Sequence, residues 1–420
     1  MQGMMMHRDL RIIDILTYAA EAFPDQGIVS ARDEGDVNRL SYPQVLGRVS
    51  QLAHGLKKLG IEEGDRVATL AWNGHRHFEL YYGISGIGAV CHTLNPRLPA
   101  EQMSYILNHA QDSVLCVDLS LIGLVEALKG DVPEGMKIVV MTDRGHMPDT
   151  TLDVLCYEEL LDGQPTDMDW PEFPETTAAG LCYTSGTTGN PKGALYSHRS
   201  TLLHALYVVT GHRESLVSGR RVLPVVPLFH VNAWGLPFTA PLAGMTMVMP
   251  GRFLDGASLF DLMEAENVFS AWGVPTVWAG LQAEIEKRGN TPPKGFEDLL
   301  VGGSAAPRAM IEAFDLERIS LGWKRGIAVE LQGLAVHADA SRRQPPILIV
   351  HSVQALVRLM PLLQQRNKRI LPLKGKRLDR LLCLPPGSHH NESITLSINE
   401  ENGGVANTDS ADNHSSDEAK

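Results

Sequence analysis

Apolar residues in the first 315 positions occur in two patterns, short continuous runs and stripes spaced three or four residues apart. The runs predict buried strands and the stripes predict helices. The predicted strands are 66–71, 89–94, 113–118, 137–142, 179–183, 194–197, 221–229, 245–249 and 298–301. The predicted helices are 41–60, 76–88, 99–110, 198–210, 258–266, 275–287 and 307–314, with a mixed helical segment at 232–244. Because strands and helices alternate, we expect an α/β fold with a mainly parallel sheet covered by helices.

Composition refines this picture. The chain has 420 residues, of which 44% are apolar, so it can bury a large core and hold more than one domain. Its net charge of −12 argues against nucleic acid as the main partner. The charge changes sign along the chain, from −15 over residues 1–315 to +9 over residues 316–389. This switch indicates a boundary near residue 315.

Cysteine usage and hydropathy indicate the compartment. The five cysteines are scattered without metal-ligand spacing, which is typical of reduced core residues in the cytoplasm. Charged residues interrupt the first 16 positions, so we expect no signal peptide. Residues 222–251 carry no charge, but five prolines divide them into shorter pieces, so we expect no transmembrane segment there. The sequence predicts a cytoplasmic protein and leaves open whether it forms a homo-oligomer.

The densest group of glycine and hydroxyl residues follows the predicted strand 179–183. Residues 183–193 read Y-T-S-G-T-T-G-N-P-K-G. Glycines let consecutive backbone N–H groups converge on an anion, Ser and Thr hydroxyls add donors, and a lysine adds a mobile positive charge. We therefore predict a phosphate-binding loop whose candidate residues are Thr184, Ser185, Gly186, Thr187, Thr188, Gly189 and Lys192.

Two other interpretations of this loop are weaker. A Walker loop needs G-x-x-x-x-G-K-[ST], but Pro191 stands five positions after Gly186, and Gly193 follows Lys192. A flexible hairpin loop without a ligand would not require so many donors and glycines together. The loop chemistry therefore favours a phosphate site of another kind.

Two further segments carry candidate chemistry. Residues 225–235 read V-V-P-L-F-H-V-N-A-W-G, in which His230 is either a core histidine beside packing aromatics or part of a ligand pocket. Residues 301–307 read V-G-G-S-A-A-P, a strand followed by a glycine turn and a helix start. A nucleophile elbow would need glycine where Ala306 stands, which argues against a serine hydrolase and leaves a tight turn as the plain alternative.

Several of these strings resemble one family. The string T-S-G-T-T-G-N-P-K-G resembles the phosphate-loop signature of the adenylate-forming superfamily, which includes acyl-CoA synthetases, firefly luciferase and peptide synthetase adenylation domains. Residues 71–79 (A-W-N-G-H-R-H-F-E) and 90–98 (V-C-H-T-L-N-P-R-L) resemble the N-terminal domain of bacterial medium-chain fatty acid CoA ligases. With 183–200 and 223–235, the resemblance covers about residues 8–315.

The resemblance implies a fold and a set of site residues. It implies the large N-terminal domain of these enzymes, with αβαβα layers of sheets and flanking helices. It implies catalytic roles for Lys192 and His230, with His230 near the acyl carboxylate. The implied acyl and adenine pocket contains His230, Val231, Asn232, Trp234, Gly235, Gly302, Gly303, Ser304 and Ala305.

The reaction that the resemblance implies has two halves. A fatty acid, which we expect to be of medium chain length, reacts with ATP to give an acyl adenylate and pyrophosphate. CoA then displaces AMP. Mg²⁺ is implied as the charge partner of ATP, because a carboxylate must approach an anionic nucleotide. A luciferase-like protein or a peptide synthetase domain would share the loop but not the strings at 71–79 and 90–98.

After residue 315 the chain departs from the family pattern. The family's [YWF]-G-x-T-E segment, T-G-D aspartate and C-terminal lysine are not found, and no Thr-Glu pair follows Gly303. The metal ligands therefore stay unassigned. We expect a truncated AMP-binding N-terminal domain at 1–315, a basic non-family segment at 316–390 and a polar, acidic, disordered tail at 391–420. A frameshifted or fused gene would explain this change, and an evolved regulatory tail is the competing idea.

Two functions follow from these observations. The first is an AMP-forming fatty acyl-CoA ligase, supported by the retained loop. The second is a catalytically inactive remnant that at most binds nucleotide or an acyl ligand, supported by the segments that are not found.

Overall fold

The structure is a computed structural model. It describes residues 5, 7–128, 130–184 and 190–314, and beyond these the strand segments 320–323, 327–331, 334–336, 348–350 and 353–357. The chain divides into two compact units, residues 1–316 and residues 317–420.

One sheet of the first unit has seven strands in the order β7-β6-β5-β3-β4-β8-β9. Their bounds are β3 Arg66–Leu70, β4 Val90–Leu94, β5 Val114–Val117, β6 Lys137–Val140, β7 Val154–Cys156, β8 Ala178–Tyr183 and β9 Gly193–Ser197. All neighbours are parallel except β8 and β9, which form an antiparallel hairpin. The carboxyl ends of the parallel strands therefore share one edge of the sheet, and Tyr183 ends β8 at that edge.

The other sheet has six strands in the order β13-β12-β10-β11-β1-β2. Their bounds are β1 Gly27–Ala31, β2 Val37–Ser41, β10 Arg221–Pro224, β11 Thr246–Met249, β12 Ser270–Gly273 and β13 Asp298–Val301. Only the β1–β2 pair is antiparallel. The predicted α/β fold with mainly parallel strands is confirmed, and the structure has two such sheets.

Helices connect these strands. The α-helices are α1 Ile13–Ala22, α2 Tyr42–Lys58, α3 His75–Gly86, α4 Ala100–Ala110, α5 Ile122–Ala127, α6 Tyr157–Leu161, α7 His198–Gly211, α8 Leu236–Ala243, α9 Gly256–Ala265, α10 Pro275–Lys287 and α11 Arg308–Ala313. The short 3₁₀ segments are η1 Leu119–Leu121, η2 Arg144–His146 and η3 Val231–Gly235. The α2 helix begins with a capping box, in which the Ser41 backbone N–H donates to the Gln44 side chain at 2.8 Å.

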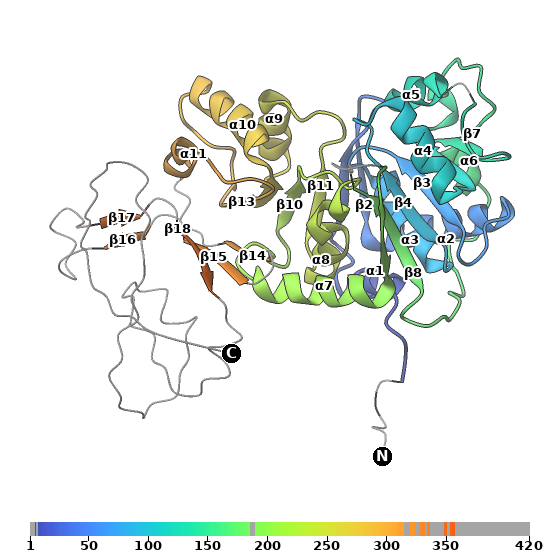
Figure 1. The fold of residues 1–420 in the computed structure, drawn as a ribbon, viewed down its shortest axis with the longest axis horizontal. Coiled ribbons are helices and arrows are strands. Elements are labelled where there is room, and N and C mark those ends of the chain that lie inside the picture. Colours follow the sequence, from blue (N-terminus) through green and yellow to red (C-terminus); the bar gives the residue numbers. More distant parts are fainter. Residues whose placement is uncertain are drawn as a thin grey trace, which may run out of the picture. The chain divides into compact units, whose positions relative to one another are not determined.

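Three clusters of buried apolar side chains define the layers. The largest joins α1, α2, α3 and α8 with residues from both sheets, so these helices lie between the sheets. A second packs α4 and α5 on the outer face of the seven-stranded sheet. A third packs α9 and α10 on the outer face of the six-stranded sheet. The first unit is thus an αβαβα arrangement, with α4 and α5 on one side and α9 and α10 on the other (Figure 1).

The structure corrects the prediction for residues 221–244. The predicted strand 221–229 ends at Pro224, because the N–H groups of Val225 and Val226 both donate to the Trp272 carbonyl, at 2.8 and 2.9 Å. Pro227 has no N–H to continue a ladder. The predicted helical segment 232–244 becomes a right-handed helix only at α8. The apolar patterns also missed β1, β2, β7, β12, α1, α5 and α6.

The second unit contains short antiparallel strands. The bounds are β14 Ser320–Trp323, β15 Ile327–Leu331, β16 Leu334–Val336, β17 Leu348–Val350 and β18 Val353–Val357. They form a three-stranded sheet in the order β14-β15-β18 and a two-stranded sheet of β16 and β17. The predicted tail at 391–420 lies outside the described residues. The predicted domain boundaries stay predictions.

Candidate active site

The predicted phosphate loop connects the two strands of the β8–β9 hairpin. Tyr183 pairs with Gly193 at the end of the ladder, and the Thr184 N–H donates to the Lys192 carbonyl at 3.0 Å. The side chains of Thr184 and Lys192 are exposed, whereas residues 185–189 lie outside the described residues. The loop therefore leaves the carboxyl end of a parallel sheet, which is where ligands bind in open α/β folds.

Two histidines hold the tyrosine that leads into this loop. The Tyr183 hydroxyl lies 2.6 Å from His109 Nδ1, and its ring lies against the His92 ring with centroids 5.2 Å apart. Burial raises the pKa of Tyr183, so the phenol keeps its proton and shares a hydrogen bond with His109. His92 Nδ1 in turn lies 2.8 Å from the Asp112 carboxylate, and both side chains are fully buried. The base of the loop is thus fixed by side chains from α4 and the sheet.

The second predicted segment forms a left-handed turn, η3. Its four non-glycine residues have φ of 50° at Val231, 49° at Asn232, 47° at Ala233 and 56° at Trp234, and Gly235 follows with 84°. Each left-handed non-glycine residue costs about 1–2 kcal/mol, and a β-branched valine is an outlier there. Strain of this kind persists only where surrounding contacts hold it, and it is enriched at functional sites.

The turn is joined to the strand that precedes the phosphate loop. Asn232 Oδ1 accepts hydrogen bonds from the Tyr81 hydroxyl at 3.1 Å and from Cys182 Sγ at 3.5 Å. Cys182 lies two residues before Thr184, and its sulfur is 3.1 Å from the Thr93 hydroxyl. Cys182, directly before the first predicted segment, and Asn232 of the second are 50 residues apart in sequence, so the two segments are joined through one buried cysteine.

The turn also contacts the third predicted segment. A Cβ on Gly302 would lie 2.6 Å from the Trp234 ring, so the indole rests directly on the Gly302 backbone. A Cβ on Gly235 would lie 2.7 Å from the His204 ring, so this position also needs glycine. Gly303 has φ of 81°, which favours glycine as well. The turn and the glycine segment thus form one surface.

The remaining predicted residues of these segments are exposed. They are Ser304, Ala305, His230 and Val231, the last with 46% of its surface accessible. The His230 N–H donates to the Pro227 carbonyl at 3.1 Å, and its position at the start of the turn leaves the imidazole open to a ligand. His230 is therefore exposed and not a core histidine, and its role in a ligand pocket stays a prediction.

Sequence reasoning missed one residue that organises this region, Asn73. Its side-chain Nδ2 donates to the carbonyls of Pro224 and Val226 at 2.7 and 2.9 Å, and its Oδ1 accepts from the Leu228 N–H at 2.8 Å. Asn73 is 4% exposed. The string at 71–79 had marked this position by resemblance alone, and no local pattern shows which backbone a buried asparagine will bind.

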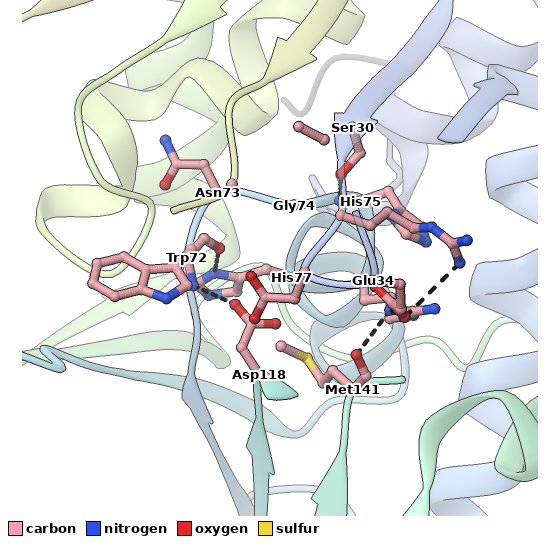
Figure 2. A pocket seen from close by; sticks show the side chains of 14 residues that line it. Ser30, Glu34, Trp72, Asn73, Gly74, His75, His77, Asp118 and Met141 are labelled. Carbon is pink, nitrogen blue, oxygen red and sulfur yellow. Dashed lines mark hydrogen bonds and ion pairs between the residues drawn. The ribbon is translucent and has the colours of Figure 1, made fainter. Parts of the chain in front are cut away.

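A separate polar pocket lies where α3 begins (Figure 2). The Trp72 N–H donates to Asp118 at 2.6 Å, and Arg76 pairs with Glu34 at 2.7 Å. Burial, with the nearby Asp33, raises the pKa of Asp118 well above its usual range. Burial, with three nearby arginines, lowers the pKa of His75 well below its usual range. No lining residue belongs to the predicted phosphate or acyl sites.

Two other expectations concern metal and membrane. Over the residues that the structure describes, no group of three His, Cys, Asp or Glu side chains is arranged to hold a metal ion. The protein ligands of the implied Mg²⁺ therefore stay unassigned. None of the helices within the described ranges combines the length and apolar character needed to cross a membrane.

Comparison with known proteins identifies the family. Residues 16–319 match the model of the family described as AMP-binding enzyme, so the chain belongs to the AMP-binding enzymes. It is 44% identical over 315 residues to a 3-methylmercaptopropionyl-CoA ligase of Ruegeria lacuscaerulensis. It is 42% identical over 316 residues to a medium-chain-fatty-acid–CoA ligase of Ectopseudomonas oleovorans. Each of these alignments covers 75% of this chain and 58% of the relative.

A third relative aligns over more of the chain. A long-chain-fatty-acid–CoA ligase of Thermus thermophilus is 39% identical over 405 residues, covering 94% of this chain and 73% of the relative. That alignment extends well beyond residue 319, where the family match ends. The chain thus spans about three fifths of the first two relatives and almost three quarters of the third.

Solved structures support the fold. A crystal structure of an anthranilate CoA ligase in complex with anthranoyl-AMP matches with a TM-score of 0.65 at 22% identity, covering 75% of this chain and 59% of the other. The N-terminal domain of a Mycobacterium tuberculosis protein, FACL13, matches with a TM-score of 0.63 at 25% identity, covering 73% of each chain. The expected large-domain fold of adenylate-forming enzymes is confirmed.

Proposed function

We propose that residues 1–315 form the ATP- and fatty-acid-binding part of an AMP-forming fatty acyl-CoA ligase. The observation that carries this proposal is the meeting of three segments that are far apart in sequence. Asn232 contacts Cys182 just before the phosphate loop, and Trp234 rests on Gly302. The three relatives are acyl-CoA ligases by name, which supports the reaction class.

The first half-reaction uses the hairpin loop. A carboxylate oxygen of the fatty acid attacks the α-phosphorus of ATP, the bond from that phosphorus to the bridging oxygen breaks, and pyrophosphate leaves. The loop N–H and hydroxyl groups would hold the departing phosphates, and the exposed Lys192 ammonium would offset their charge. Catalysis is then positioning and electrostatic stabilisation, because the protein forms no covalent bond to either substrate.

The acyl group would lie beside the turn. His230, exposed at the rim, would donate a hydrogen bond to the carboxylate, and Trp234 with Gly302 would line the chain. In the second half-reaction the CoA thiol attacks the acyl carbonyl carbon, its proton leaves to solvent, and AMP departs. Each methylene buried by the pocket contributes about 0.8 kcal/mol, so pocket depth sets the chain-length preference. We propose medium-chain acids as the substrates.

Other parts of the proposal rest on the family alone. ATP and CoA are the substrates we propose, with Mg²⁺ bound to the nucleotide phosphates when ATP is present. A cytoplasmic location and a homo-oligomeric state also stay predictions.

Carboxylate-dependent exchange between ATP and labelled pyrophosphate tests the proposal. With octanoate, we expect exchange in the full chain and a loss of about 100-fold or more in Lys192→Ala, because one charged donor to a developing anion contributes on this scale. Lys58→Ala, at the exposed end of α2, is the matched control and should exchange like the unmodified chain. Equal rates in Lys192→Ala and the unmodified chain would contradict the assigned role.

A second candidate is a chain that binds ligands without turning them over. The observation that favours it is that the family match ends at residue 319 and no Thr-Glu pair follows. Calorimetric titration with ATP separates the two. The second candidate would be supported if the unmodified chain binds ATP more tightly than Lys192→Ala does but exchanges pyrophosphate no faster than that variant.

A further inference from the structure

The left-handed turn at Val231–Gly235 needs support from outside itself. Within the segment, the Ala233 N–H makes contacts of 3.2 Å to the carbonyls of Pro227 and His230. These contacts close the loop before the turn. They do not fix the backbone conformations of Asn232 and Trp234, which must be held by contacts with other segments. Four consecutive non-glycine residues with positive φ would relax to right-handed conformations if nothing held them.

Tyr81 of α3 supplies the main external contact. Its hydroxyl lies 2.7 Å from the Leu228 carbonyl and 3.1 Å from Asn232 Oδ1, so one group contacts the chain on both sides of His230. Tyr81 is 3% exposed. Its ring packs edge-on against Phe238 of α8, with centroids 5.6 Å apart, and stacks on His77. The hydroxyl therefore has little freedom to move away from the turn.

Asn73, at the entry to the same helix, holds the preceding backbone. Its three hydrogen bonds fix Pro224, Val226 and Leu228, so the chain enters the turn from a rigid loop. Asn73 and Tyr81 both contact Leu228, one at its N–H and the other at its carbonyl. Asn73, just before α3, and Tyr81, within α3, thus fix the entry to the turn and its second residue.

We propose that Tyr81 is a positioning residue, which keeps Val231–Gly235 left-handed so that the Trp234 indole lies on Gly302. The proposal deepens the proposed function, because this surface is the one assigned to the acyl chain. Tyr81 does not need to touch a substrate for this role. It acts through Asn232 and Leu228.

Tyr81→Phe isolates the hydroxyl, because it keeps the ring and its packing. Tyr42→Phe is the matched control: Tyr42 is also fully buried, and its hydroxyl donates to the Met245 carbonyl away from the turn. Both variants should unfold cooperatively with a similar loss of stability. A merely structural role for Tyr81 would make them equivalent in every further measurement.

The test reads the Trp234 environment by acrylamide quenching of fluorescence. The chain has six tryptophans, so the Trp234 contribution is obtained by subtracting the matching Trp234→Phe variant in each background. In Tyr81→Phe we expect a red-shifted Trp234 emission and a higher quenching constant than in the unmodified chain, with Tyr42→Phe unchanged. Quenching in Tyr81→Phe equal to that in Tyr42→Phe would overturn the proposal.

Exchange kinetics give a second arm that depends on activity. Tyr81→Phe should raise the octanoate KM by about fivefold, as expected for one lost hydrogen bond, with the KM for ATP unchanged. Equal rises in both KM values would contradict a role confined to the turn. If the unmodified chain shows no exchange, the proposed function fails, whereas the fluorescence comparison still decides the role of Tyr81.

Discussion

The β8–β9 hairpin and the left-handed turn at Val231–Gly235 are two loops of one candidate site, but they are specified in different ways. The function of the hairpin loop can be predicted from its local sequence, because its glycines and hydroxyl residues together indicate phosphate binding. The turn has no such local signature, and it is held by Tyr81, by Cys182 and by the backbone of Gly302. A site can thus combine one loop that carries its chemistry locally with another that distant contacts must shape.

This difference predicts where each loop is sensitive. Changes near the hairpin should affect ligand chemistry more than stability, because Thr184, Asn190 and Lys192, which are among its described loop residues, are exposed. Changes to the support of the turn should affect stability first, because that support is buried.

The largest effect should come from Asn73→Ala. It leaves two carbonyls and one N–H without their buried partner, so we expect a loss of about 3 kcal/mol or more in the free energy of unfolding. Asn95→Ala is the control, since that side chain accepts one bond from the Arg97 N–H near the surface. Urea denaturation measures both. Similar losses of unfolding free energy in the two variants would contradict the role of Asn73 in supporting the turn.

A pH dependence comes next, on the hairpin side. His198, which begins α7 after β9, accepts a bond from the Ile12 N–H, and burial with Arg11 lowers its pKa from 6.5 to about 4. As the pH falls, His198 is therefore protonated in the unfolded chain before it is protonated in the folded chain. The contribution of neutral His198 to the free energy of unfolding is complete above about pH 6.5 and is lost between 6.5 and 4, by about 1–3 kcal/mol.

Denaturation at pH 7.5 and pH 5 measures this loss. His198→Asn should reduce the dependence, and the buried His77 of α3, whose pKa burial also lowers to about 4, should account for part of what remains. An unchanged slope in His198→Asn would rule out this contribution.

A smaller loss should follow from Gly193→Ala at the end of the hairpin. The new Cβ would lie 2.9 Å from Leu181 Cδ1, and we expect a loss of about 1 kcal/mol as these side chains shift. Gly123→Ala in α5 is the control, because no atom lies within 4 Å of its Cβ position. Thermal unfolding compares the two, and a Gly193→Ala variant as stable as Gly123→Ala would show that the hairpin end tolerates a side chain.

The smallest effect should come from Tyr183→Phe. It removes the hydroxyl bond to His109 at a partly exposed position, and we expect a loss of about 0.5–1 kcal/mol. Tyr105→Phe, whose ring also contacts His109, is the matched control. A larger loss in the control would indicate that stacking, rather than the hydroxyl, holds the base of the loop.

The sequence predicted the structure correctly where a segment's conformation depends on residues close to it in the chain. It predicted α2, α4, α7 and α10 and most parallel strands within a few residues, because their apolar spacing is regular. It missed β12, whose sequence S-A-W-G has Ser and Gly at its ends instead of an apolar run, and β2, whose side chains are partly exposed. The prediction continued β10 through 225–229, because the apolar residues there resemble a strand. In the structure the N–H groups of Val225 and Val226 both donate to the Trp272 carbonyl, which ends the strand pairing.

In the candidate site, too, local segments were predictable and long-range contacts were not. The loop, His230 and the glycine segment were predicted from local strings, whereas Asn73 and Tyr81 were not, because their partners lie some 150 residues away. The roles of the site residues stay predictions, and Ser185 to Gly189 lie outside the described residues.

Formation of the acyl adenylate tests the account most directly. The chain is mixed with ATP labelled at the α-phosphate, octanoate and Mg²⁺ but no CoA, and the quenched products are separated. We expect octanoyl adenylate and pyrophosphate in equal amounts, in proportion to the enzyme, with the yield sharply reduced in Lys192→Ala. ADP as the product, or ATP left intact while it binds, would contradict an adenylation site built from the hairpin and the turn.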